Sequence, residues 1–100
     1  MVRAQAPRKR YILFECSESH ENLKNALYDD ALKFFGELGL SYAAIKLVEF
    51  DGKHGIIRCS RDYKDKVLGF LALSSLRLRP LRSSGTLTRL NKVLEDIHSR

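Results

Sequence analysis

Few side chains in this chain could carry out catalysis, and their spacing does not favour it. Asp29 and Asp30 are adjacent in a segment with helical periodicity. Neighbouring helical residues point about 100° apart, so these two carboxylates cannot face each other as an acid–base pair. The chain also lacks a glycine-rich phosphate loop, a nucleophile elbow and a pair of histidines at helical spacing. The sequence therefore predicts a protein without an active site of its own.

The cysteines and histidines do not indicate a metal site. Cys16 and Cys59 lie in apolar runs without C-x-x-C spacing, which is typical of buried, reduced thiols. The three histidines, His20, His54 and His98, are scattered along the chain. A structural zinc site needs about four convergent ligands. We expect no metal or other cofactor bound by the protein itself.

Basic residues are the most informative polar feature. Two segments, residues 2–10 and 74–92, carry no acidic residue, and their nine basic residues are Arg3, Arg8, Lys9, Arg10, Arg77, Arg79, Arg82, Arg89 and Lys92. Arg77 and Arg79 alternate with leucines, so both are expected on the strand face opposite the core. Ser83, Ser84 and the start of the following helix could also hold a phosphate. Arginine binds phosphate bidentately, which suits contacts to an RNA backbone. The competing interpretation is that these arginines only keep an edge strand from aggregating.

Composition favours one soluble domain in which basic and acidic residues are concentrated in different segments. The chain has 100 residues, 44% of them hydrophobic and 30% charged, with a net charge of +6. Residues 15–37 reverse the sign, because six acidic residues there accompany only Lys24 and Lys33. This asymmetry suggests one side for a polyanion and another for a different partner. No apolar run reaches the ~20 residues of a membrane helix, and no signal peptide is evident, so a cytoplasmic protein is expected.

Hydrophobic periodicity predicts a basic tail over residues 1–9 and a single α/β sandwich domain over residues 10–100. Strands are expected at residues 10–16, 41–50, 55–60 and 76–81, and helices at 18–38, 61–73 and 86–98. Asp51-Gly52 between two apolar runs predicts a hairpin. The order β-α-β-β-α-β with an additional C-terminal helix is a ferredoxin-like, RRM-like α+β fold. Right-handed crossovers place the third strand between the first and second, with the fourth beyond the first. Cys16 and Cys59 then lie at opposite ends of the sheet, too far apart for a disulfide.

The sheet face opposite the two main helices is expected to be unusually apolar. It would carry the candidate protein-interface residues Tyr11, Leu13, Val48, Phe50 and Ile56. An apolar patch of this kind marks a protein interface, or a surface covered by the amphipathic C-terminal helix. Conventional RNA-recognition motifs stack bases on aromatic residues of the central strands. The third strand has no aromatic residue, which leaves only Tyr11 for stacking.

The stretch from Ala44 to Cys59, AIKLVEFDGKHGIIRC, resembles the signature of the ribonuclease P protein component 2 family. There, a strand ending in an aromatic residue and Asp leads through a short turn to Gly, apolar residues and Arg. The opening RYILFE at residues 10–15 and the SGTL at residues 84–87 are similar to the family's first strand and to the start of its last helix. The likeness covers nearly the whole chain from Arg10 onward. An acidic C-terminal extension, found in eukaryotic members, is missing, which favours an archaeal source.

This resemblance implies a non-catalytic subunit of ribonuclease P. Such a protein pairs with ribonuclease P protein component 3, assembles with other ribonuclease P proteins, and supports the catalytic domain of the ribonuclease P RNA. The RNA, with Mg²⁺, removes the 5′ leader from precursor tRNA. The candidate RNA-binding residues are Arg8, Lys9, Arg10, Lys53, His54, Arg58, Arg77, Arg79, Arg82, Ser84 and Arg89. We expect the acidic first helix to lie away from the RNA. The alternative is a ferredoxin-like protein-interaction or ligand-regulatory domain that does not bind RNA.

Overall fold

The computed structural model describes residues 8–17 and 22–99. The elements are β1 Lys9–Cys16, α1 Leu23–Ala43, β2 Lys46–Phe50, β3 His54–Ser60, the short 3₁₀ helix η1 Arg61–Tyr63, α2 Lys64–Leu73, β4 Leu78–Ser84 and α3 Leu87–His98. Of the tail expected over residues 1–9, residues 1–7 lie outside this description, and Lys9 already belongs to β1. No helix in the described ranges combines the length and the apolarity needed to cross a lipid bilayer.

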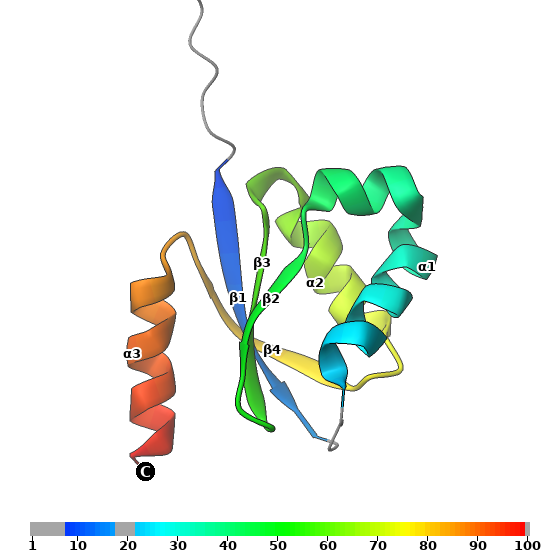
Figure 1. Ribbon diagram of the computed structural model, residues 1–100. Helices are drawn as coiled ribbons and strands as arrows, with labels where there is room; N and C mark the ends of the chain where they lie inside the picture. The colour runs from blue at the N-terminus through cyan, green and yellow to red at the C-terminus, as the bar shows by residue number, and fades with distance from the viewer. Residues whose placement is uncertain (1–7, 18–21, 100) are drawn as a thin grey trace, which may run out of the picture.

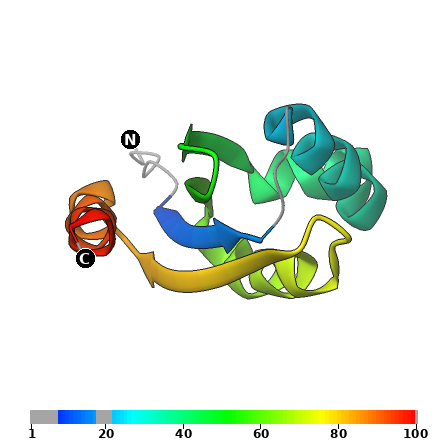
Figure 2. The same ribbon diagram turned by 90° about the horizontal axis from the view of Figure 1, so that it is seen from below.

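The molecule has three layers, with the sheet in the middle. Helices α1 and α2 cover one face of the sheet and α3 lies against the other (Figures 1 and 2). All pairings are antiparallel, in the order β2-β3-β1-β4. This confirms the ferredoxin-like topology, the strand order and the extra C-terminal helix predicted from the sequence.

The larger core lies between the sheet and the α1–α2 layer. Ile12 and Phe14 of β1 face Leu27 of α1 and Phe70 of α2, and all four side chains are buried. Cys16 and Cys59 also lie in this core and do not form a disulfide. Cys59 is paired in register with Arg10, at the start of β1, whereas Cys16 ends that strand. The two thiols therefore lie at opposite ends of the sheet, as expected.

Helix α3 covers the second face of the sheet. Its Leu90 packs on Leu13 and Ile56, and none of the three exposes more than 1% of its surface. Tyr11 and Val48 pack partly buried around them. The prediction that this face meets a partner protein therefore needs correction for Leu13 and Ile56, which are inaccessible while α3 is in place. The alternative, cover by the C-terminal helix, is the arrangement observed.

Phe50 lies on the opposite face from the one predicted. A bulge between Leu47 and Glu49 shifts the β2–β3 register, so Phe50 pairs with Gly55 instead of continuing the simple alternation. The Phe50 ring consequently stacks on Phe14, with 6.2 Å between ring centroids, in the core beneath α1 and α2. Phe50 is thus a core residue and not part of the sheet face that α3 covers.

The boundary between the first helix and the second strand also differs from the prediction. Gly39, the expected helix stop, stays helical, and it is Gly36 that takes a positive φ of 74° and breaks α1 into two segments (Figure 1). The helix then continues through Ala43. It ends at Ala44, which is left-handed and donates its N–H to the carbonyl of Leu40. Residues 41–43 are therefore helical, and β2 begins only at Lys46.

Gly55 is required by the packing of β1 against β3. A Cβ at this position would collide with the Phe14 ring and lie 2.8 Å from the carbonyl oxygen of Glu49. We expect Gly55→Ala to lower the free energy of unfolding by about 1–3 kcal/mol, because the overpacked core must shift. Gly69→Ala in α2 is the matched control, since its Cβ would meet nothing within 4 Å. Urea denaturation of both variants checks this, and equal stabilities would contradict it.

Candidate nucleic-acid interface

Cations gather at the end of the sheet where β1 begins. Arg58 of β3 is paired in register with Tyr11 of β1 on one side and Lys46 of β2 on the other. These three residues form a row across the sheet at this end. Arg8 and Lys9 precede Tyr11, and the backbone N–H of Arg61 donates to the carbonyl of Arg8 at 2.9 Å. We call this group the basic end, and its members are Arg8, Lys9, Arg10, Lys46, Arg58 and Arg61.

The loop from β4 to α3 lies beside the basic end. Ser84, the last residue of β4, pairs with Tyr11, and the guanidinium of Arg10 packs against Gly85. Arg82 and Arg89 flank this loop and are both exposed. A phosphate at the start of α3 would compete with a bond already present, because the Thr86 N–H donates to Ser84 Oγ at 3.2 Å. The side chains around this loop therefore extend the positive surface of the basic end.

A small pocket of about 80 Å³ opens at the basic end and is lined by Arg8, Lys9, Ala44, Arg58, Cys59 and Ser60. It does not create a reactive thiol. Burial raises the pKa of Cys59 to about 11. The thiol is therefore protonated at neutral pH and is no nucleophile. Three of the lining residues, Arg8, Lys9 and Arg58, are cationic, although the lining itself is mainly apolar.

Four of the predicted RNA-binding residues lie toward the other end of the sheet: Lys53, His54, Arg77 and Arg79. Glu15 binds Arg79 Nη2 through Oε2 at 2.8 Å, and its Oε1 lies 3.9 Å from Lys53 Nζ. The hydrogen bond from Arg79 lowers the pKa of Glu15, which is therefore ionised at neutral pH. His54, opposite Glu15 in the sheet, is only 7% exposed. Lys53 and Arg79 are thus partly neutralised, and His54 presents almost no surface.

Arg77 does not lie in a strand as predicted. It precedes β4 and takes a left-handed φ of 57°. The alternation of arginines and leucines therefore does not place Arg77 on the same strand face as Arg79. A bulge in the β1–β4 pairing then brings Arg79 opposite Glu15 and Arg82 opposite Leu13, on the same face. The arginines predicted to bind RNA from this segment are therefore divided: Arg82 is nearer the basic end, and Arg77 and Arg79 lie toward the opposite end.

Sequence reasoning missed Lys46 and Arg61 as members of the basic end. Lys46 starts β2, and Arg61 follows β3 directly. The signal that could have found both was the antiparallel topology itself. It brings the first residues of β1 and β2 and the last residues of β3 to the same end of the sheet. Asp62 and Asp65, in the first turns of η1 and α2, are the nearby acidic residues in sequence.

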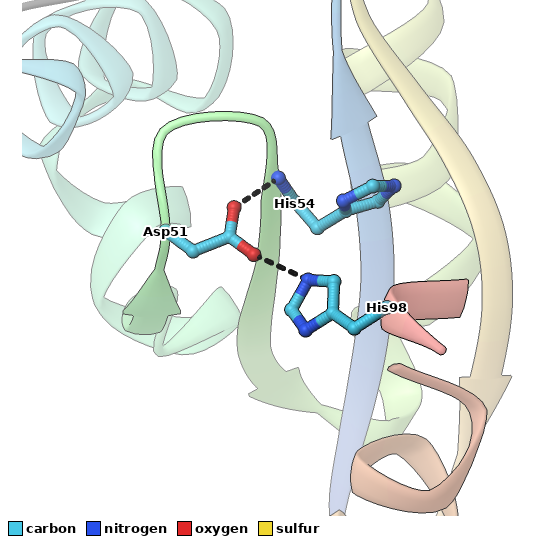
Figure 3. A group of neighbouring side chains, drawn as sticks. All are labelled: Asp51, His54 and His98. Carbon is cyan, nitrogen blue, oxygen red and sulfur yellow. Dashed lines mark hydrogen bonds and ion pairs between the residues drawn. The ribbon is translucent and has the colours of Figure 1, made fainter. Parts of the chain in front are cut away.

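Asp51, His54 and His98 come together at the end of the sheet opposite the basic end (Figure 3). Asp51 Oδ2 lies 2.9 Å from His98 Nε2. This contact links the β2–β3 turn to the last residue of α3. Burial by itself would raise the pKa of Asp51, but hydrogen bonds from the backbone N–H groups of His54 and Lys53 and from His98 together lower it. Two histidines that are scattered in the sequence are therefore neighbours in the fold, contrary to expectation.

Large apolar side chains are exposed on the helices of the α1–α2 layer. We call them the apolar helix surface: Leu32, Phe34, Leu38 and Tyr42 of α1, and Leu73 of α2. Leu73 exposes 76% of its surface and Leu38 68%. Phe34 and Leu73 line a pocket of about 360 Å³, together with Asp30 and Ser74, whose hydroxyl donates to Asp30 Oδ2 at 2.9 Å. This surface belongs to a different face of the molecule from the one that α3 covers.

Comparison with known proteins gives one consistent result. Residues 10–95 match the model of the Rpp14/Pop5 family. Proteins named ribonuclease P protein component 2 are similar along most of their length. The one from Archaeoglobus fulgidus is 37% identical over 85% of this chain and 86% of its own. Those from Pyrococcus abyssi and Pyrococcus furiosus are 33% and 36% identical, over 85% of this chain and 82% and 81% of their own. The resemblance seen in the sequence is confirmed, and the chain belongs to the Rpp14/Pop5 family, together with archaeal ribonuclease P protein component 2.

Proposed function

We propose that this protein is a non-catalytic subunit of an archaeal ribonuclease P. Its relatives are named as protein components of that enzyme, which supports the assignment directly. In this role it supports the catalytic domain of the RNA subunit during removal of the 5′ leader from precursor tRNA. The RNA and its Mg²⁺ supply the chemistry, so the protein contributes binding and positioning alone.

The observation that carries the RNA-binding part of this proposal is the basic end. Its cations come from strand ends and turns that the sheet holds in fixed positions. Because the backbone at these positions is fixed, only the side chains have to be ordered when the cations bind the phosphates of a folded RNA. Phosphate contacts of this kind position a protein on RNA without reading bases. This fits the absence of an aromatic residue from β3.

The salt dependence of binding tests this proposal. Each phosphate neutralised by Lys or Arg releases counterions, so log K falls with log salt by about 0.7–0.9 per contact. If the six cations of the basic end each meet a phosphate, the slope is about −4 to −5. Filter binding of an archaeal ribonuclease P RNA across a salt series measures it. Absence of binding, or affinity unchanged by salt, would refute the RNA-binding role and favour a ferredoxin-like protein-interaction domain.

The apolar helix surface supports pairing with a second protein subunit, which we propose to be ribonuclease P protein component 3. Monomeric soluble proteins seldom expose several large apolar side chains together, and such groups mark protein interfaces. Two of the five side chains, Phe34 and Leu73, line a pocket, which gives a partner residue a place to insert. The basic end uses other elements, so one protein could hold RNA and its partner at once.

We expect Leu38→Glu with Leu73→Glu to weaken pairing with component 3 by at least ~10-fold, because two charges would be buried against the partner. Both side chains are largely exposed in the isolated protein, so its stability should change little. Thr88→Glu with Ser99→Glu is the control, because it adds the same two charges at exposed positions at the two ends of α3, outside the apolar helix surface. Size-exclusion chromatography of the mixed proteins measures pairing. Full co-elution of the Leu38→Glu, Leu73→Glu variant with the partner would place the interface elsewhere.

A further inference from the structure

Three potential metal ligands converge where α3 ends beside the β2–β3 turn. Asp51 comes from the turn, His54 is the first residue of β3, and His98 is the last residue of α3. Each offers a ligand atom, and these atoms all lie within 4.8 Å of one another. The two imidazole rings are 5.9 Å apart between centroids and inclined at 70° (Figure 3). The cluster thus joins residues far apart in the sequence, since His98 follows His54 by 44 positions and Asp51 by 47.

The carboxylate of this cluster is held in a defined orientation. Asp51 Oδ1 accepts hydrogen bonds from the backbone N–H groups of Lys53, at 2.9 Å, and His54, at 2.6 Å. These bonds leave Oδ2 directed toward His98. A ligand whose second oxygen is fixed by the backbone loses little freedom when it binds an ion. The sheet holds the backbone of His54, and the side chain of His98, which is 52% exposed, has room to rotate toward the other two ligands.

We infer that Asp51, His54 and His98 bind a divalent transition-metal ion of the zinc class. Two imidazoles and one carboxylate are ligands that suit Zn²⁺, whereas Mg²⁺ and Ca²⁺ prefer all-oxygen sites. Ligands about 2.0 Å from a tetrahedral ion lie about 3.3 Å from each other. The present separations, within 4.8 Å, therefore need a closure of about 1.5 Å at most, which is within the range of side-chain rotation.

The surrounding charges are compatible with a cation. Glu15 is paired opposite His54, and its carboxylate offsets the positive charges of Arg79 and Lys53 beside the cluster. The nearest lysine in sequence, Lys53, is directed toward Glu15, with Nζ 3.9 Å from Oε1. With three protein ligands, a fourth position remains for water or for a group from another molecule. Asp51 and His98 are both accessible from solvent, which gives the ion a route into the site.

Metal binding would fasten α3 to the rest of the fold. The contacts of α3 are mainly with β1 and β4. The ion would add a link between the last residue of α3 and the β2–β3 turn. An ion that binds only the folded protein stabilises it by mass action. At about a hundred times its Kd, Zn²⁺ should raise the Tm of this domain by roughly 10 °C. The basic end lies at the other end of the sheet, so this site does not depend on the proposed RNA contacts.

Titration of the full chain with Zn²⁺ and with Co²⁺ tests the inference. Isothermal titration should give one Zn²⁺ per chain, Co²⁺ should develop the visible absorption of a four-coordinate site, and Mg²⁺ should cause neither change. His98→Gln and Asp51→Asn should each weaken Zn²⁺ binding by at least ~10-fold and abolish the rise in Tm. Asn at position 51 can still accept the two backbone hydrogen bonds, and His98 is exposed, so both variants should fold.

Two controls locate the site. His20→Gln removes the remaining histidine of the chain, and Asp96→Asn removes an exposed carboxylate of α3 that is outside the cluster. Both variants should bind Zn²⁺ as the unaltered protein does. Unchanged affinity in His98→Gln and Asp51→Asn, loss of binding in His20→Gln, or the absence of saturable Zn²⁺ binding would each overturn the inference.

Discussion

Leu90→Ala should lower the free energy of unfolding by about 2–5 kcal/mol, a large part of the ~5–15 kcal/mol that stabilises a domain of this size. Leu90 is the one fully buried residue among those described in α3, and it fills the space between Leu13 and Ile56. Truncation leaves a cavity at the centre of this contact. It also removes the main attachment of α3 to the sheet. Urea denaturation followed by circular dichroism measures the change.

Lys92→Ala provides the control, because Lys92 is an exposed residue of the same helix. Its effect should stay within about 0.5 kcal/mol. The Leu90→Ala variant should also expose the apolar face that includes Leu13 and Ile56, which increased binding of a hydrophobic dye would detect. A stability equal to that of Lys92→Ala would mean that α3 does not pack on the sheet in solution.

The second large effect is expected at the basic end. Lys9→Gln, Lys46→Gln and Arg58→Gln together should weaken binding to a ribonuclease P RNA by at least ~10-fold and reduce the salt slope by about 2 to 3. Lys9 and Lys46 are exposed and Arg58 is half-buried, and none forms an ion pair among the described residues. Their charges are therefore available to phosphate. Filter binding at several salt concentrations measures both quantities.

A variant with the same change in net charge separates position from charge. Lys53→Gln, Arg77→Gln and Arg79→Gln also remove three positive charges, but at the opposite end of the sheet, where Glu15 already binds two of them. Its affinity should stay within about 3-fold of the unaltered protein, since charges beyond a Debye length of the RNA contribute little. If this variant lost more affinity than the basic-end variant, the RNA would lie at the Glu15 end instead.

The topology could be predicted from the sequence because its signals are local. Alternating and helical periodicities, Asp51-Gly52 at the hairpin and Gly85 before α3 identify the elements, and the handedness of crossovers then fixes the strand order. The end of α1 was mispredicted because two glycines lie three residues apart. Only the tertiary packing decides that Gly36 takes the positive φ and Gly39 remains helical.

Bulges explain most of the errors in side-chain placement. One extra residue in β2 reverses the face of Phe50, and another irregularity, between Leu13 and Phe14 in the β1–β4 register, puts Arg79 and Arg82 on the same face. A pattern of alternating residues contains no sign of such an insertion. The basic residues were therefore recognised by type, whereas their division between two ends of the sheet needed the register.

The convergence of the histidines could not have been predicted. Residues 54 and 98 share no periodicity, and their distance depends on where α3 lies on the sheet. That position was left open from the sequence, because the apolar sheet face could equally have met a partner. Once Leu90 is seen to pack on Leu13 and Ile56, the length of α3 carries His98 to the β2–β3 turn.

Reconstituted cleavage of precursor tRNA tests the proposed function most directly. An archaeal ribonuclease P RNA would be assembled with its other protein subunits and Mg²⁺, with or without this protein, and release of the 5′ leader would be measured. We expect the rate to fall when this protein is omitted, to recover with the unaltered chain, and to recover poorly with the Lys9→Gln, Lys46→Gln, Arg58→Gln variant. The protein alone should cleave nothing. Equal rates with and without this protein, or cleavage by the protein in the absence of RNA subunit, would contradict its assignment as a non-catalytic subunit that binds the RNA.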